Sequence, residues 1–271
     1  MSLPLSHPHA ATPAGLAPAG DSVRRHNVEI HRNRSAWNRK PILRAICGQF
    51  YRQIRAELTT TAPGITLELG SGLGNIKEHI PHCVTSDLFP NPWLDRQENA
   101  YALTCQPDSV ANLILFDVWH HLRYPGPALR EFHRVLAPGG RLVLFEPAAS
   151  WCGRVIYQLF HHERVALGSA ISWEAPAGFA PQDADYYTAQ GSATRVFWWR
   201  EEPERLAGWN VTVVRPVTSF AYFASGGFSG PSLAGTFLHN LLNRLDRKIA
   251  LWPRAFAARL LVVLEKPAAA R

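Results

Sequence analysis

The chain has 271 residues, of which 46% are hydrophobic and 18% are charged, and it contains nine Trp. This composition is typical of a soluble globular protein with a substantial core, and it argues against a chain that is disordered throughout. The formal net charge is +7, and the sequence offers no run of roughly 18 apolar residues that would predict a membrane span.

Cysteines and histidines do not form a metal-binding pattern. The four cysteines lie far apart without a CxxC pair, and the adjacent pairs His120-His121 and His161-His162 lack the i,i+4 spacing of a helical metal site. We therefore predict no metal ion and no disulfide framework. Reduced thiols are typical of the cytoplasm, which is the predicted location.

The first 60 residues divide into two predicted segments. Residues 1–20 are rich in Pro, Ala and Gly without any periodicity, which predicts a disordered tail rather than a secretory signal. Residues 21–60 are predicted to be a basic arm followed by a helix. The arm, residues 21–40, holds six Lys or Arg against two acidic residues. A solvated arm is one interpretation, and contact with a phosphate-bearing substrate or nucleic acid stays open, although no nucleic-acid module is recognisable.

Helical and strand patterns alternate after this arm. Apolar residues recur every three to four positions from Trp37 to Leu58, which predicts an amphipathic helix. Strands are predicted at "ITLEL", "CVTSD", "NLILFD", "GRLVLFE", "WNVTVVRP" and "ARLLVVLEK", and "NIKEHI" is predicted to begin a helix. Such alternation predicts an α/β fold of the doubly wound, Rossmann-like type, in which a mostly parallel sheet is covered on both faces.

The stretch "LELGSGLGN" follows the first predicted strand. Its glycines, Gly70, Gly72 and Gly74, allow sharp turns and close approach of a ligand to backbone N–H groups. Asp87, after the next strand, can accept hydrogen bonds from two ribose hydroxyls. NAD and S-adenosylmethionine both carry such a ribose, so these residues alone leave both cofactors open.

Four motifs in order decide between them: "LELGSGLG", "SDLF", "NLILFDVWHHL" and "EFHRVLAPGGRLVLFEP". In these motifs, residues 60–147 resemble class I S-adenosylmethionine-dependent methyltransferases, in particular the type 11 group related to ubiquinone and menaquinone methyltransferases. The resemblance implies a seven-stranded sheet with an antiparallel last strand, a methyltransferase domain over residues 61–271, and S-adenosylmethionine as the cofactor.

Site residues follow from the same resemblance. It implies that Glu68 and the glycine loop hold the methionine part of the cofactor, Asp87 its ribose, and Asp117 the region near the ammonium group. Asn99-Ala100 stands where many relatives have Asp-Ala, and the Asn carbonyl can still accept from the adenine amine. Pro107 and Asp108 are expected to open a short helix. The complete set of expected cofactor contacts is Glu68, Gly70, Ser71, Gly72, Gly74, Asp87, Leu88, Asn99, Ala100, Asp117 and His120.

Two insertions are expected to cap the cofactor edge of the sheet and to select the substrate. They cover residues 148–208 and 221–256. An apolar stripe with neighbouring basic residues in the second one is interpreted as packing on the domain. A lid, or a membrane-surface or lipid contact through residues 233–251, stays open as an alternative.

Methyl transfer to a hydroxyl needs a base, and histidine suits that task near neutral pH. The catalytic candidates are His121, His161, His162 and Tyr157. We predict methyl transfer to a small molecule, most readily to an oxygen of a natural product, sugar or lipid-linked intermediate. Open alternatives are transfer to carbon or nitrogen, a cyclase or aminocarboxypropyl transferase that uses the sulfonium differently, and a non-catalytic cofactor-binding protein. The acceptor and the oligomeric state do not follow from the sequence.

Overall fold

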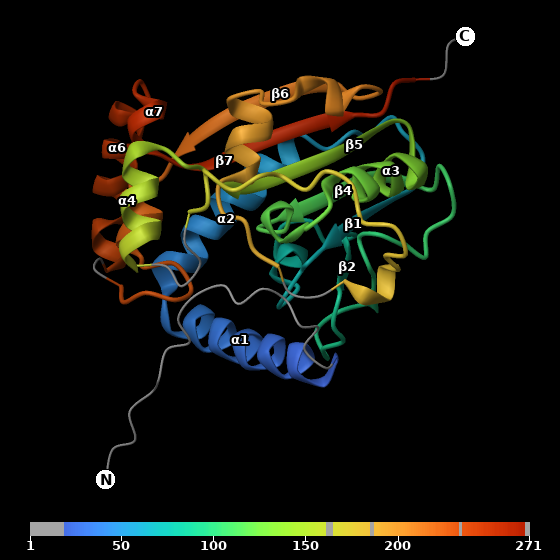
Figure 1. Cartoon of the computed structure of the whole chain (residues 1–271). Coiled ribbons are helices and arrows are strands. Elements are labelled where there is room, and N and C mark those ends of the chain that lie inside the picture. Colours follow the sequence, from blue (N-terminus) through green and yellow to red (C-terminus); the bar gives the residue numbers. More distant parts are fainter. Residues whose placement is uncertain (1–18, 161–164, 185–186, 233–234, 269–271) are drawn as a thin grey trace.

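A seven-stranded sheet forms the centre of the protein in the computed structural model, which describes residues 19–160, 165–184, 187–232 and 235–268. The strand order is β3-β2-β1-β4-β5-β7-β6 (Figure 1). Its strands are β1 (Ile65–Leu69), β2 (Val84–Asp87), β3 (Arg96–Gln97), β4 (Val110–Phe116), β5 (Leu136–Pro147), β6 (Asn210–Thr218) and β7 (Ala257–Glu265). Within this sheet β7 runs in the direction opposite to the other six strands, so the predicted Rossmann-like fold is confirmed.

Helices cover both faces of this sheet. They are α1 (Ala19–Arg39), α2 (Pro41–Ala56), α3 (Pro125–Val135), α4 (Trp151–Phe160), α5 (Phe220–Ala224), α6 (His239–Ile249) and α7 (Pro253–Phe256). Along β4, Leu113 and Leu115 join the core on the α3 face, whereas Ile114 joins the core on the α2 face. β4 is therefore apolar along almost its whole length, as expected of a strand buried on both sides. Among the described residues, no helix has both the length and the apolar character to cross a bilayer.

The N-terminal segment differs from its predicted form. Residues 1–18 of the predicted tail lie outside the described residues, and helix α1 begins at Ala19. The basic arm is mostly this helix, whose residues Ile30 and Trp37 are buried. The helix predicted from Trp37 is in fact two helices, because Pro41 lacks an amide hydrogen and occupies the first turn of α2.

Two other predicted helices are missing or shorter than expected. "NIKEHI" forms only a 3₁₀ helix, η1 (Asn75–Glu78), and Pro81 soon afterwards disfavours helical backbone in the residue before it. Pro107 and Asp108 form a turn instead of a helix, since Asp108 has a left-handed backbone with φ of 56°. The amide of Asp108 donates to the carbonyl of Arg134 and closes this turn onto the end of α3.

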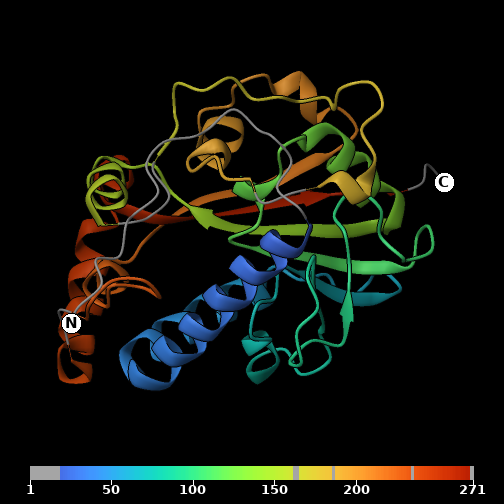
Figure 2. The ribbon, with the colours of Figure 1, turned by 60° about the horizontal axis from the view of Figure 1, so that its bottom comes forward.

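Both insertions contribute elements at the carboxyl edge of the parallel strands. The first begins with α4, directly after β5 ends at Pro147. The second contains α5, α6 and α7 between β6 and β7. Figures 1 and 2 agree that α4, α6 and α7 gather at the same end of the sheet. This is the end at which ligands bind in open α/β sheets.

Candidate active site

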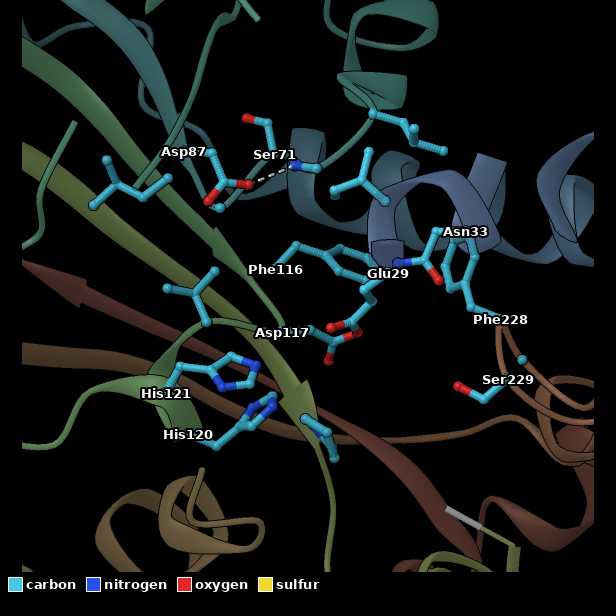
Figure 3. Close-up of a pocket in the computed structure, with 18 of the residues that line it drawn as sticks. Glu29, Asn33, Ser71, Asp87, Phe116, Asp117, His120, His121, Phe228 and Ser229 are labelled. Carbon is cyan, nitrogen blue, oxygen red and sulfur yellow. Dashed lines mark hydrogen bonds between the residues drawn. The ribbon is translucent and has the colours of Figure 1, made fainter. Parts of the chain in front are cut away.

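A cavity of about 660 Å³ opens at the carboxyl ends of β1, β2 and β4. This volume is within the range of small-molecule sites. Its walls come from the loop after β1, from α1 and α4, and from the segment 220–231. Figure 3 shows Asp87 and Ser71 on one side of it, His120 and His121 on another, and Phe228 and Ser229 on a third.

The glycine loop after β1 has left-handed backbone at each glycine, with φ of 66° at Gly70, 54° at Gly72 and 69° at Gly74. A Cβ at Gly70 would lie 2.3 Å from a methyl group of Val118, so a side chain there would collide with the protein. At Gly72 the nearest atom, in Ile30, is 3.5 Å away. Gly72 therefore exposes its backbone to the cavity, whereas Gly74 lies outside the cavity lining.

Asp87 closes β2 beside this loop. One carboxylate oxygen, Oδ2, accepts from the Gly72 amide at 3.1 Å, and Oδ1 accepts from the Leu88 amide at 2.8 Å. Burial raises the pKa of Asp87, and His26 of α1, whose Nε2 lies 3.8 Å from Oδ2, opposes that rise. Each oxygen retains a further lone pair, so the fixed carboxylate can accept hydrogen bonds from a ligand.

Glu68 lies deeper in the cavity wall and is 3% exposed. Its Oε2 atom has no hydrogen-bond partner in the structure. Burial is the main reason why the pKa of Glu68 is raised to about 8. A buried carboxyl without a partner is costly, and a cationic ligand group in the cavity would relieve that cost.

The two histidines follow β4 in the 3₁₀ helix η2 (Trp119–His121). Nδ1 of His120 lies 2.6 Å from Oε2 of Glu146, and both side chains are buried. The other oxygen of Glu146 accepts from the amides of Val118 and Trp119, each at 2.8 Å. Nδ1 of His121 lies 2.7 Å from the carbonyl oxygen of Tyr187. Glu146 therefore fixes the ring of His120 at the cavity wall.

A buried arginine from the last strand completes this wall. Arg259 is 1% exposed and forms an ion pair with Asp117, which has a left-handed backbone with φ of 58°. The guanidinium carbon lies 4.4 Å from the centre of the Tyr222 ring, a favourable cation–π distance. The carboxylate of Asp117 is therefore paired with a side chain of the protein itself, that of Arg259.

Comparisons with known proteins decide the family. A model of the methyltransferase domain matches residues 43–201, which is more than half of the chain. The chain belongs to this methyltransferase family. It is an S-adenosylmethionine-dependent methyltransferase of class I, as its motifs predicted. The unpartnered carboxyl of Glu68 and the open backbone of Gly72 fit a cofactor that carries a charged amino group.

Solved structures support the fold of this methyltransferase. A chain of the complex between the Haloferax volcanii Trm112 methyltransferase activator and a methyltransferase superposes with a TM-score of 0.52 at 13% identity, covering 92% of this chain and 99% of that one. A methyltransferase from Thermotoga maritima gives a TM-score of 0.51 at 14% identity, covering 88% of this chain and 99% of that one. A search of curated protein sequences finds no match.

The remaining predicted site residues of the methyltransferase fall into three groups. Asn99 and Ala100 line the cavity, and Oδ1 of Asn99 accepts from the Tyr101 amide at 2.9 Å. Tyr157 also lines it, but its hydroxyl donates to the carbonyl of Ala258 at 3.2 Å, and burial raises its pKa well above the usual range. His161 and His162 lie outside the described residues.

Asp117, His120 and Glu146 of the methyltransferase offer ligand atoms within 4.8 Å of one another, a spacing that suits a metal ion. These side chains already have partners. Asp117 pairs with Arg259, and both oxygens of Glu146 accept hydrogen bonds or pair with His120. A metal ion would have to displace Arg259 before it could bind.

Sequence reasoning missed three features of this methyltransferase site: Glu146, Arg259 and helix α1. Two of them left a signal. Glu146 closes an apolar strand just as Glu68 does, and Arg259 is the charged residue within the apolar run of β7. The side chains of Glu29 and Asn33 on α1 reach the cavity only because that helix lies across the loop at Gly72.

Proposed function

We propose that this methyltransferase transfers the methyl group to a hydroxyl oxygen of a small, largely apolar molecule, with His120 as the general base. The observation that carries this proposal is the buried pair of His120 and Glu146 at the cavity wall, with Nδ1 of His120 2.6 Å from Oε2 of Glu146. A carboxylate on Nδ1 favours the tautomer in which Nε2 accepts a proton.

The cofactor supplies a methyl group on a sulfonium, which is already an activated electrophile. We assign its binding to the cofactor side of the cavity, which we define as Glu68, the loop 70–74, Asp87 and Asn99–Ala100. Asp87 would accept from the ribose hydroxyls, and Glu68 would pair with the amino group. Glu68 has the unpartnered oxygen that this role requires.

We define the acceptor side as His120, Tyr157, Tyr222, Phe228 and Arg259, all of which line the cavity. Three of these five residues are aromatic, so the wall favours an apolar acceptor that stacks or packs against rings. His120 would take the proton of the acceptor hydroxyl, and the imidazolium that forms would be stabilised by Glu146. The protein's other tasks are to align oxygen with methyl group and to exclude water.

The experiment that tests this proposal is an acceptor screen with a labelled methyl donor. Phenols, apolar alcohols and matched amines and thiols of the same skeleton are incubated with the enzyme, and products are identified by mass spectrometry and NMR. We expect methyl ethers from the hydroxyl compounds. Turnover of amines or carbon acceptors with no methyl ether formed would overturn the assignment of oxygen while leaving methyl transfer intact.

A further inference from the structure

Large apolar side chains are exposed on α4, on the 3₁₀ helix η6 (Thr236–Leu238), on α6 and on the turn between α6 and α7. Phe237 is 82% exposed, Leu251 78%, Trp151 75% and Leu159 67%. We call these residues, together with Val155, Leu241, Leu245 and Trp252, the apolar end face. Figures 1 and 2 both show α4, α6 and α7 at one end of the sheet. A group of exposed apolar side chains at one end of the molecule is typical of a binding face.

Helix α4 has two different apolar sides. Its outer side carries Trp151, Val155 and Leu159, which repeat at i, i+4 and i+8 and are all exposed. Its inner side carries Ile156 and Tyr157, which line the cavity. One helix therefore separates the acceptor side of the cavity from the apolar end face by its own thickness.

Helix α6 adds basic residues to the same face. Its inner side holds Leu242 against the core, and Asp246 accepts from the amides of Phe220 and Ala221. Its outer side carries Leu241 and Leu245. Arg244 and Lys248 follow these leucines by three residues, so they lie on the same side of the helix and are exposed.

The exposed charged side chains of this region are positive. Exposed basic residues are Arg154, Arg244, Arg247, Lys248 and Arg254. Within 151–160 and 237–256 the acidic residue is Asp246, whose carboxylate is turned inward to the two backbone amides. Apolar groups surrounded by cations match a surface that is apolar inside and anionic at its boundary.

We propose that the apolar end face docks onto an anionic phospholipid bilayer. Trp151, Trp252 and the leucines would enter the boundary between headgroups and acyl chains, while Arg244 and Lys248 would contact lipid phosphates. A second copy of the chain is a poorer occupant, because a two-fold interface would bring the same basic residues together. Docking places the cavity beside the membrane surface, from which an apolar acceptor can enter.

Vesicle co-sedimentation of the full chain tests this docking without any acceptor. Vesicles of phosphatidylcholine alone are compared with vesicles of equal parts phosphatidylcholine and phosphatidylglycerol. We expect binding to the anionic vesicles, at least about tenfold weaker binding to the neutral ones, and loss of binding as salt rises. Absence of binding to anionic vesicles, or self-association that blocks it, would overturn the proposal.

Two matched pairs of variants locate the surface. Val155→Glu, on the apolar end face, should lower the partition coefficient at least about tenfold, whereas Val211→Glu, at an exposed valine on the edge strand β6, should leave it unchanged. Arg244→Glu should lower it about tenfold to thirtyfold, and Arg52→Glu, on an exposed site of α2, should not.

Equal effects within each pair would mean that binding follows net charge or hydrophobicity alone. That result would refute the assignment of the apolar end face as the docking surface. Thermal melting checks that each variant is folded. Because Val155 and Arg244 lie outside the cavity lining, methylation of a water-soluble acceptor should persist in both variants. Failure of the docking proposal is therefore distinguishable from failure of the proposed reaction.

Discussion

The cofactor side of the cavity and its acceptor side differ in how far apart their parts lie along the chain. The proposed cofactor side comes from one continuous stretch, residues 68–100, and offers backbone amides and carboxylates to a ligand. The acceptor side takes His120 from the end of β4, Tyr157 from α4, Tyr222 from α5 and Arg259 from β7. In the proposed arrangement, the cofactor site is therefore encoded locally in the sequence, whereas the acceptor site depends on packing between distant segments.

The largest effect is expected at the acceptor side. His120→Asn should lower turnover by roughly 10²- to 10⁴-fold, because the acceptor hydroxyl loses its base, while the dissociation constant for S-adenosylmethionine stays the same. Steady-state kinetics and calorimetry measure the two quantities. His121→Asn, at the neighbouring ring, is the matched control and should retain most of the activity. The opposite result, with His121 essential and His120 dispensable, would transfer the role of base to His121.

A second large effect is expected on the cofactor side of the cavity. Gly72→Val should weaken cofactor binding by at least about 100-fold, because the branched side chain must adopt a φ of 54° and would project into the cavity. Gly178→Val is the matched control, since Gly178 also has a positive φ, of 86°, but has no atom within 4 Å of its added Cβ. Comparable loss of affinity in both variants would indicate general strain.

The contrast also explains which features the sequence could predict. The positions of most strands and the glycine loop follow from local patterns, since an apolar run that ends in a glycine turn has few alternatives. Asp87 is predictable for the same reason. Its partner Gly72 is only fifteen positions away along the chain.

Other features depended on tertiary contacts. Helix α1 has a basic, weakly apolar sequence, and its place over Gly72 depends on contacts of Ile30 and Trp37 that no local period encodes. The roles of Glu146 and Arg259 depend on the folded sheet, in which β4, β5 and β7 bring them beside His120 and Asp117. The carboxyl of Asp117 was expected near the cofactor's ammonium group, and its ion pair with Arg259 could not be foreseen.

Glu68 offers a test of the cofactor side that needs no acceptor. Its pKa of about 8 in the folded protein is above that of the unfolded chain, so its contribution to stability is fully present below about pH 4.5 and is lost as pH rises to about 8. Glu68→Gln should therefore stabilise the cofactor-free protein at pH 9, by on the order of 5 kcal/mol, but not at pH 4.5.

Thermal melts at both pH values measure this difference, and the same variant should bind S-adenosylmethionine more weakly. Glu265→Gln serves as the control, because Glu265 is partly exposed and pairs with Arg141. A pH-independent effect of Glu68→Gln would show that Glu68 is not a strained buried acid.

Asp87→Ala should have a smaller effect on the same side. Losing charge-assisted bonds to the ribose hydroxyls, each worth roughly 1.5–3 kcal/mol, should raise the dissociation constant at least about tenfold. Calorimetry with S-adenosylhomocysteine measures it. Asp95→Ala is the control, because Asp95 also accepts from a backbone amide, that of Thr85, but lies outside the cavity lining. An unchanged affinity in Asp87→Ala would mean that the ribose binds elsewhere.

The smallest expected effect concerns how the acceptor side is held in place. Lys40, between α1 and α2, donates from Nζ to the carbonyls of Gly227 at 2.6 Å and Gly230 at 2.5 Å. These bonds fix the segment that carries Phe228 into the cavity. Lys40→Met should raise KM for the acceptor by roughly threefold to tenfold, since charged hydrogen bonds of about 1.5–3 kcal/mol are lost and partly replaced by water. The cofactor dissociation constant should not change, because the cofactor side does not contact this segment in the proposed arrangement.

Arg39→Met removes a neighbouring exposed charge and is the matched control for Lys40→Met. Equal loss of cofactor and acceptor affinity in Lys40→Met would break the division of the cavity into two independently built sides.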